Sequence, residues 1–334
     1  MPRTAPFAAL PLLAAVALGA AGSADADSFA RTAPYELLTD VEPDPWCDDG
    51  EDAYVLDTAA DLRGPHFSLS LRCLFQDDAI PRDLAASDPG LEHVVPVEDG
   101  AEFLIAQVAR QADYTSEHGT DADRTTAWIQ AGGERFDLAG VPAAGRYLVL
   151  SVPVGEDAVL WVEDTGRAQG LDLRTGEQVD PVGAYYSDLL LGTIEIDGYD
   201  TGKVEVYNSR GSGHVRCPQD SVWAHRFVWR EDLGWAEPGT VFLELRFGWC
   251  ARSDAFTWEL DRESAVTVDR DAPLSWTATE LEGGWDHLAL VFAVPEDADA
   301  ITVDFTPYGD IEHVEAGPVA FSEELPSFTW TAEF

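Results

Sequence analysis

The chain has 334 residues, and 62 acidic against 20 basic residues give it a formal net charge of −42 at pH 7. This balance argues against a nucleic-acid partner, because phosphate backbones are bound by basic stripes and the sequence has none. The length exceeds what one hydrophobic core usually serves, which predicts two domains. A genome with a biased base composition would explain why Lys203 is the single lysine, but it would not explain the excess of acidic residues. A solvating acidic exterior explains it, and a cation or a basic partner is the other interpretation.

The N-terminus has the pattern of a secretory signal peptide, predicted over residues 1–26. Arg3 supplies the positive charge, residues 7–21 are apolar, and Ala24-Asp25-Ala26 offers a small-x-small cleavage site. The apolar stretch is shorter than the roughly 20 residues that span a bilayer, and no later segment reaches that length. The sequence therefore predicts a secreted or extracellular protein with no membrane span. Such a protein either diffuses freely or associates with the cell wall.

Residues 27–60 are acidic and interrupted by Pro43 and Pro45, which predicts a leader with little regular structure. This leader contains the densest acidic cluster of the chain. Calcium prefers several hard oxygen ligands from one short loop, so the cluster is a candidate metal site. It lacks the spacing of a helix-loop-helix calcium site, and a solvated loop is the alternative. The cluster consists of Asp44, Asp48, Asp49, Glu51 and Asp52.

Four cysteines in an exported chain predict two disulfides. The most local pairing of the three that are possible is Cys47–Cys73 with Cys217–Cys250, one bridge for each domain. Each bridge would contribute about 3–4 kcal/mol of stability in the loop-entropy model. Zinc is the alternative, but no CxxC motif occurs and no histidine shows ligand spacing near these cysteines.

A block of sequence occurs twice, which predicts a tandem repeat. Glu98-Asp99-Gly100-Ala101-Glu102-Phe103-Leu104 precedes Leu148-Val149-Leu150-Ser151-Val152-Pro153 by about fifty residues. Glu237-Pro238-Gly239-Thr240-Val241-Phe242-Leu243 precedes Leu290-Val291-Phe292-Ala293-Val294-Pro295 by nearly the same interval. Spacings of this kind are typical of two copies of one supersecondary unit joined in series.

Alternation of apolar and polar residues predicts strands throughout both copies. In the second copy Leu243, Leu245 and Phe247 are expected on the buried face, with Glu244 and Arg246 opposite. Leu104, Ala106 and Val108 are expected inward in the first copy. Pro153 and Pro295 cannot donate to a ladder, so each should end its strand. The predicted fold is all-β, with one β-sandwich over 61–180 and a second over 181–334.

The stretch between the copies gives two weaker expectations. Residues 191–196 and 203–207 flank Asp197-Gly198-Tyr199-Asp200 as the two strands of a hairpin would. The glycine- and serine-rich residues 209–214 are expected to form a loop, since they lack the spacing and the helix of a nucleophile elbow.

Each copy has the same order of local features as a known family. A Pro-Gly or Asp-Gly turn is followed by a "FLxL" strand, then by a strand ending in Val-Pro, and then by an acidic turn. This order is similar to that of the telokin-like, immunoglobulin-type sandwich domains of unknown function in exported actinobacterial proteins, over about residues 66–178 and 215–334. The resemblance implies immunoglobulin-like folds and a non-enzymatic role, and it supplies no catalytic residue. This chain departs from the usual pattern by lacking a lipidation cysteine and by doubling the unit.

Tryptophan is the best indication of function, since eight of the eleven lie at or after Trp223. Trp235 and Trp285 fall in predicted loops, where an indole can stack on a sugar ring or anchor a protein partner. The alternative is that both rings cover the ends of a sandwich.

The expected protein is a monomeric, non-catalytic binder of a protein or glycan at or near the cell envelope, without a cofactor unless calcium binds. A secreted hydrolase with an unrecognised carboxylate pair and a calcium-stabilised spacer are the alternatives.

Overall fold

The computed structural model describes residues 31–41, 55–80, 97–109, 118–189 and 191–334. These residues form β-strands with short connections and no α-helix, so the all-β prediction is confirmed for them. The helical turns are two short 3-10 segments, η2 (Gly183–Tyr185) and η3 (Glu282–Gly284). Within the described ranges no helix has the length and apolar character that crossing a membrane requires. The predicted signal peptide 1–26 lies outside the described residues.

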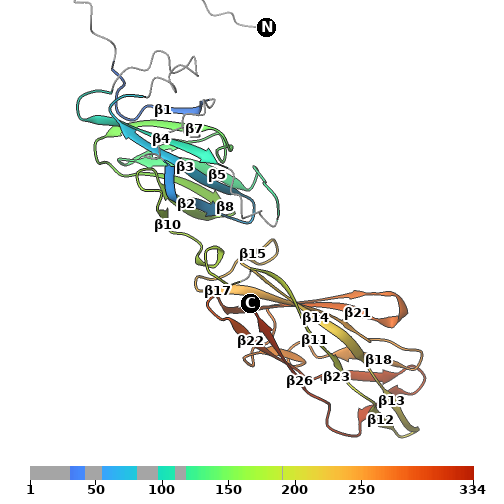
Figure 1. Ribbon diagram of the computed structural model, residues 1–334. Coiled ribbons are helices and arrows are strands. Elements are labelled where there is room, and N and C mark those ends of the chain that lie inside the picture. Colours follow the sequence, from blue (N-terminus) through green and yellow to red (C-terminus); the bar gives the residue numbers. More distant parts are fainter. Residues whose placement is uncertain (1–30, 42–54, 81–96, 110–117, 190) are drawn as a thin grey trace, which may run out of the picture.

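The first unit, shown in blue to green in Figure 1, consists of two antiparallel five-stranded sheets, ordered β1-β7-β4-β3-β2 and β10-β9-β8-β5-β6. Its core lies between them, with Leu104 and Leu150 from the first sheet and Ile129 and Leu160 from the second fully or almost fully buried. The strands are β1 (Leu37–Val41), β2 (Val55–Arg63), β3 (Ser68–Asp77), β4 (Ala101–Ala109), β5 (Thr125–Ala131), β6 (Glu134–Asp137), β7 (Tyr147–Pro153), β8 (Ala158–Asp164), β9 (Arg167–Asp172) and β10 (Gln178–Val179).

The second unit has one five-stranded sheet, ordered β11-β14-β17-β21-β20, faced by three-stranded sheets ordered β19-β22-β26, β13-β12-β25 and β18-β23-β24. The short ribbon β15-β16 lies apart from these sheets. The strands of the large sheet are β11 (Gly192–Asp200), β14 (Pro218–Phe227), β17 (Thr240–Trp249), β20 (Ser275–Glu280) and β21 (Asp286–Pro295). The remaining strands are β12 (Val204–Asn208), β13 (Gly211–Val215), β15 (Trp229–Arg230), β16 (Gly234–Trp235), β18 (Phe256–Leu260), β19 (Val266–Val268), β22 (Ala300–Phe305), β23 (Gly309–His313), β24 (Gly317–Pro318), β25 (Ala320–Phe321) and β26 (Phe328–Glu333).

The two units share the order of four strands in their main sheets. The neighbours β2-β3-β4-β7 of the first unit correspond to β11-β14-β17-β21 of the second, in the same chain order. The fifth strand differs, because the first unit adds β1 from its N-terminal side and the second adds β20 from the segment between β17 and β21. The duplicated sequence blocks thus form the central strand pair of each main sheet.

The turn that starts each central pair has the same hydrogen bond in both units. The Gly100 carbonyl accepts the Val154 N–H at 2.9 Å, and the Gly239 carbonyl accepts the Glu296 N–H at 3.0 Å. Both glycines have positive φ angles, 88° and 81°, which residues with a side chain rarely adopt. As predicted, β7 and β21 end at their prolines.

The predicted burial of the alternating strands is confirmed. On β17 the side chains of Leu243, Leu245 and Phe247 are almost completely buried in the second core. On the opposite face Glu244 pairs with Arg230 at 2.9 Å and with Arg246. Leu104, Ala106 and Val108 are likewise buried in the first unit.

Three expectations about secondary structure are wrong. The described part of residues 27–60 contains β1 and the start of β2, because these segments complete the first sheet. The predicted hairpin of 191–196 with 203–207 does not form, since β11 pairs with β14 and β12 pairs with β13. Residues 211–215, expected in a loop, are the strand β13 that completes this second hairpin.

The predicted Cys217–Cys250 disulfide is present and connects the start of β14 to the end of β17. Cys73, buried in β3, is also disulfide-bonded. Its predicted partner Cys47 lies outside the described residues, as do the calcium candidates Asp44, Asp48, Asp49, Glu51 and Asp52.

The units meet end to end, at a joint where Trp229 of the second unit contacts three residues of the first (Figure 1). The rings of His66 and His118 meet the indole edge-on, at centroid distances of 4.6 and 5.0 Å. The Arg124 guanidinium lies 5.6 Å from the indole centroid. Trp229 is only 5% exposed although it belongs to neither core of its own unit, so its burial comes largely from this socket.

Polar contacts surround the Trp229 socket. Arg124 pairs with Glu231 across the joint at 2.7 Å, and the Trp235 indole N–H donates to the Asp164 carbonyl at 3.0 Å. The Asp164 carboxylate accepts hydrogen bonds from both the backbone N–H and the Nδ1 of His66, each at 2.8 Å, and thereby fixes the orientation of that ring. These contacts predict that the two units keep one preferred orientation.

Trp229→Ala should uncouple the units while leaving both sandwiches folded. Truncating a buried tryptophan typically costs about 3–5 kcal/mol, and here the loss falls on the joint. We expect small-angle scattering to show a broader distribution of end-to-end lengths, with unchanged circular dichroism. Trp223→Ala is the matched control, because Trp223 is 44% exposed on β14 of the same unit. Equal scattering profiles for the two variants would show that the socket does not set the orientation.

The joint should weaken as the pH falls. Partial burial, with smaller electrostatic contributions from His66 and Arg124, lowers the pKa of His118 against the opposing effect of Asp164 and Glu231. A histidine whose pKa is depressed in the joined state opposes joining once the pH drops below its ordinary value of about 6.5. Scattering at pH 7.5 and pH 5 should therefore show broadening in acid. His118→Phe keeps an aromatic ring in the socket and should reduce that response; an undiminished response would exclude His118 as its source.

Candidate functional site

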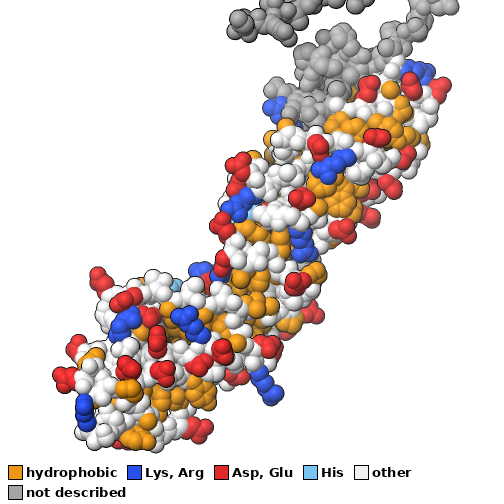
Figure 2. Space-filling model, turned by 180° about the vertical axis from the view of Figure 1, so that it is seen from behind, with side chains coloured by type: hydrophobic (Ala, Val, Ile, Leu, Met, Phe, Trp, Pro, Cys, Tyr) orange, Lys and Arg blue, Asp and Glu red, His pale blue; other side chains and the backbone are white. Residues whose placement is uncertain are grey.

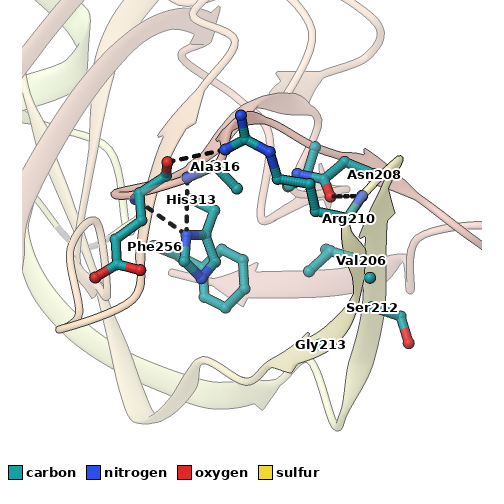
Figure 3. Close-up of a pocket in the computed structure, with 11 residues that line it drawn as sticks. Val206, Asn208, Arg210, Ser212, Gly213, Phe256, His313 and Ala316 are labelled. Atoms are coloured by element: carbon teal, nitrogen blue, oxygen red, sulfur yellow. Dashed lines mark hydrogen bonds between the residues drawn. The ribbon is translucent and has the colours of Figure 1, made fainter.

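A groove of about 450 Å³ opens between the hairpin β12–β13 and the strands β18 and β23 (Figure 3). These strands lie at the end of the second unit away from the joint (Figure 1). The hairpin β12–β13 forms one wall. Phe256 of β18 and His313 of β23 form the other, and Glu315, Ala316 and Val319 complete the lining. The groove therefore lies between two of the small sheets that cover the core.

The groove exists because one strand lacks side chains on its inner face. Alternate residues of a strand point to the same side, so Gly211 and Gly213 share a face of β13. They pair with Asn208 and Val206 of β12, and Val206 is buried in the core. A Cβ atom on Gly213 would lie 3.2 Å from the Phe256 ring. Any larger side chain at position 213 would occupy the groove.

Hydrogen bonds hold the polar rim in place. The Asn208 side-chain oxygen accepts the Arg210 backbone N–H at 2.8 Å, an arrangement that stabilises the hairpin turn. The Arg210 side chain reaches across the groove and donates from Nη1 to the Glu315 carbonyl at 3.2 Å, as Figure 3 shows. Arg210 forms no ion pair with a described carboxylate, so the rest of its guanidinium remains available to a ligand.

His313 has a defined tautomer. Its Nδ1 accepts the backbone N–H groups of Glu315 and Ala316, at 3.1 and 3.2 Å (Figure 3). A nitrogen that accepts hydrogen bonds carries no proton, so Nε2 is the ring nitrogen that can donate to a ligand. The ring also packs edge-on against Phe256, at a centroid distance of 5.0 Å. The rim thus combines donors from Arg210, Asn208 and His313 with an aromatic wall.

The groove suits reversible binding of a small amphipathic group. Its volume lies within the range of ligand sites, and it joins apolar side chains to a few polar ones. Glu315 is the single carboxylate among the lining residues, whereas glycoside hydrolysis by two carboxylates needs a pair. Across the described ranges no group of three His, Cys, Asp or Glu residues could hold a metal ion.

The two tryptophans predicted as binding residues lie far from each other in the fold. Trp235 is part of the joint, where its N–H donates to Asp164 and the Arg167 guanidinium lies 5.4 Å from its ring. Trp285 lines a separate hollow beside Gly248 and His287. Neither residue lines the groove, whose glycine-rich strand gave no signal in the sequence beyond the alternation of Gly211 and Gly213.

Comparison with protein-family models, with curated proteins and with solved structures gives no match.

Proposed function

We propose that this is a secreted, non-catalytic recognition protein, built from two tandem immunoglobulin-like domains, that binds a glycan at or near the cell envelope. The groove between β12–β13 and Phe256 carries this proposal, since it combines an aromatic wall with hydrogen-bond donors that have unused capacity. The described chain supports export through its Cys217–Cys250 disulfide, a bond typical of oxidising compartments.

A sugar ring fits the chemistry of the groove better than a peptide anchor does. Sugars present C–H faces that pack on aromatic rings and hydroxyl groups that both donate and accept hydrogen bonds. Arg210, His313 and Asn208 can donate to such hydroxyls, and Glu315 can accept from them. The acidic exterior, visible as red side chains over both units in Figure 2, disfavours strongly anionic ligands.

The immunoglobulin-like assignment is part of the proposal and has its own support. The units share the strand order β2-β3-β4-β7 and β11-β14-β17-β21, and each buries a core between facing sheets. The resemblance to the exported telokin-like family agrees with that arrangement and with a role in binding.

Filling the groove should abolish glycan binding without unfolding the protein. We expect the full chain to bind members of an oligosaccharide panel and Gly213→Val to weaken that binding at least tenfold, about 1.4 kcal/mol. The melting temperature should change little, because valine favours strands and glycine does not. Isothermal titration calorimetry and a thermal melt provide the two measurements.

His214→Val is the matched control, since it introduces the same side chain on the other face of β13. Equal loss in both variants would mean that the strand, and not the groove, is perturbed. Binding of a protein and of no sugar would replace the proposal with protein recognition. Turnover of the oligosaccharides would favour the hydrolase, and a melt sensitive only to chelators would favour the calcium-stabilised spacer.

A further inference from the structure

A second hollow, of about 480 Å³, lies on the outer face of the large sheet of the second unit, at the end away from the joint. It is lined by Trp285, the exposed Leu281, Pro218, Gln219, Asp220 and His287, above the backbone of Gly248. The hollow shares no lining residue with the groove, so a ligand bound here would be held independently.

The indole of Trp285 is fixed before any ligand arrives. A Cβ on Gly248 would lie 3.3 Å from Cε3 of the indole, so the ring packs closely over this glycine. The preceding Gly284 has a φ of 82°, and a Cβ there would collide with the Arg252 carbonyl. The Arg252 N–H donates to the Gly284 carbonyl at 2.8 Å, and the Leu281 N–H donates to the Trp285 carbonyl at 2.7 Å. A rigid aromatic loses little entropy on binding.

The polar groups around this indole favour a cationic ligand. Asp220 forms no ion pair with any basic residue in the described ranges, and the Gln219 and His287 side chains make no hydrogen bond there. The nearest arginine of the loop, Arg252, already pairs with Asp286 and Glu280. An acidic residue without a basic partner and an indole that line the same hollow are a combination that attracts an ammonium group, and the net charge of −42 adds to that attraction.

We infer that the Trp285 hollow binds an amine-bearing sugar unit, with the sugar ring on the indole and the ammonium group facing Asp220. This site goes beyond the proposed groove function, and it can exist whether or not the groove binds a glycan. An amino sugar satisfies both observations at once, because it joins an apolar ring face to a positive charge of the size that one carboxylate can neutralise.

The test compares two probes that differ only at the amine. A chitosan hexasaccharide and its fully N-acetylated counterpart are titrated into the full chain at a mildly acidic pH, where the amines are protonated. We expect the chitosan to bind at least tenfold more tightly, and Asp220→Asn to remove most of that preference. Trp285→Ala should weaken chitosan binding at least tenfold, and Trp285→Phe should restore part of it.

Trp223→Ala is the matched control, because it removes an indole that is 44% exposed on β14 of the same sheet and lines neither the groove nor this hollow. Its chitosan affinity should equal that of the wild type. Wild-type affinity in Trp285→Ala would overturn the inference, since attraction to the acidic surface alone would then explain the binding. Equal affinity for both probes would also overturn it, because the amine would contribute nothing.

Discussion

The antiparallel pairing of β4 with β7 and of β17 with β21 is the constraint on which both units depend. In the second unit the pairing runs without a break from Thr240–Pro295 to Trp249–Asp286, which makes it the longest ladder among the described residues. Because successive side chains alternate, one face of β17 buries Leu243, Leu245 and Phe247. That apolar face must be covered, and the three small sheets of the second unit cover it. The groove is a place where this cover is incomplete.

The extreme acidity is compatible with folding because the buried acids are paired. A carboxylate removed from water without a partner is costly, whereas an exposed one adds only weak repulsion that salt screens. Each of the four acidic side chains that the structure describes as buried has a cationic or histidine partner. The pairs are Asp61 with Arg63, Glu102 with Arg174, Asp164 with His66, and Glu244 with Arg230. The net charge therefore resides on the surface, where it acts on ligands and not on the core.

The sequence predicts the strands whose apolar residues alternate with polar ones, because burial of one face produces that alternation. It does not predict strands in which glycine interrupts the alternation. Alternation located β17 and β21, because Leu, Phe and Val on one face leave a single register that buries them all. The hairpin predicted for residues 191–207 does not form. Spacing along the chain favours pairing of adjacent strands, but β11 pairs with β14, which is longer than β12. Strand β13 was missed since Gly-Ser-Gly has low strand propensity and is held by pairing with β12 alone. The groove could not be predicted for the same reason: it depends on which strand faces Phe256, a contact between residues far apart in the sequence.

The groove and the Trp285 hollow each depend on a glycine within a strand, at a position where a side chain would meet a neighbouring residue. This placement argues for function. Glycine in a strand interior weakens the strand and leaves space that a packed core would fill. At Gly213 the missing side chain opens the groove beside Phe256, and at Gly248 it gives the Trp285 indole its place. Both positions lie toward the end of the second unit opposite Trp229, where the first unit cannot cover them. Packing is therefore incomplete at Gly213 and Gly248, whereas Trp229 is fully packed in the joint. This contrast places both candidate binding sites at the end of the second unit that the first unit does not cover.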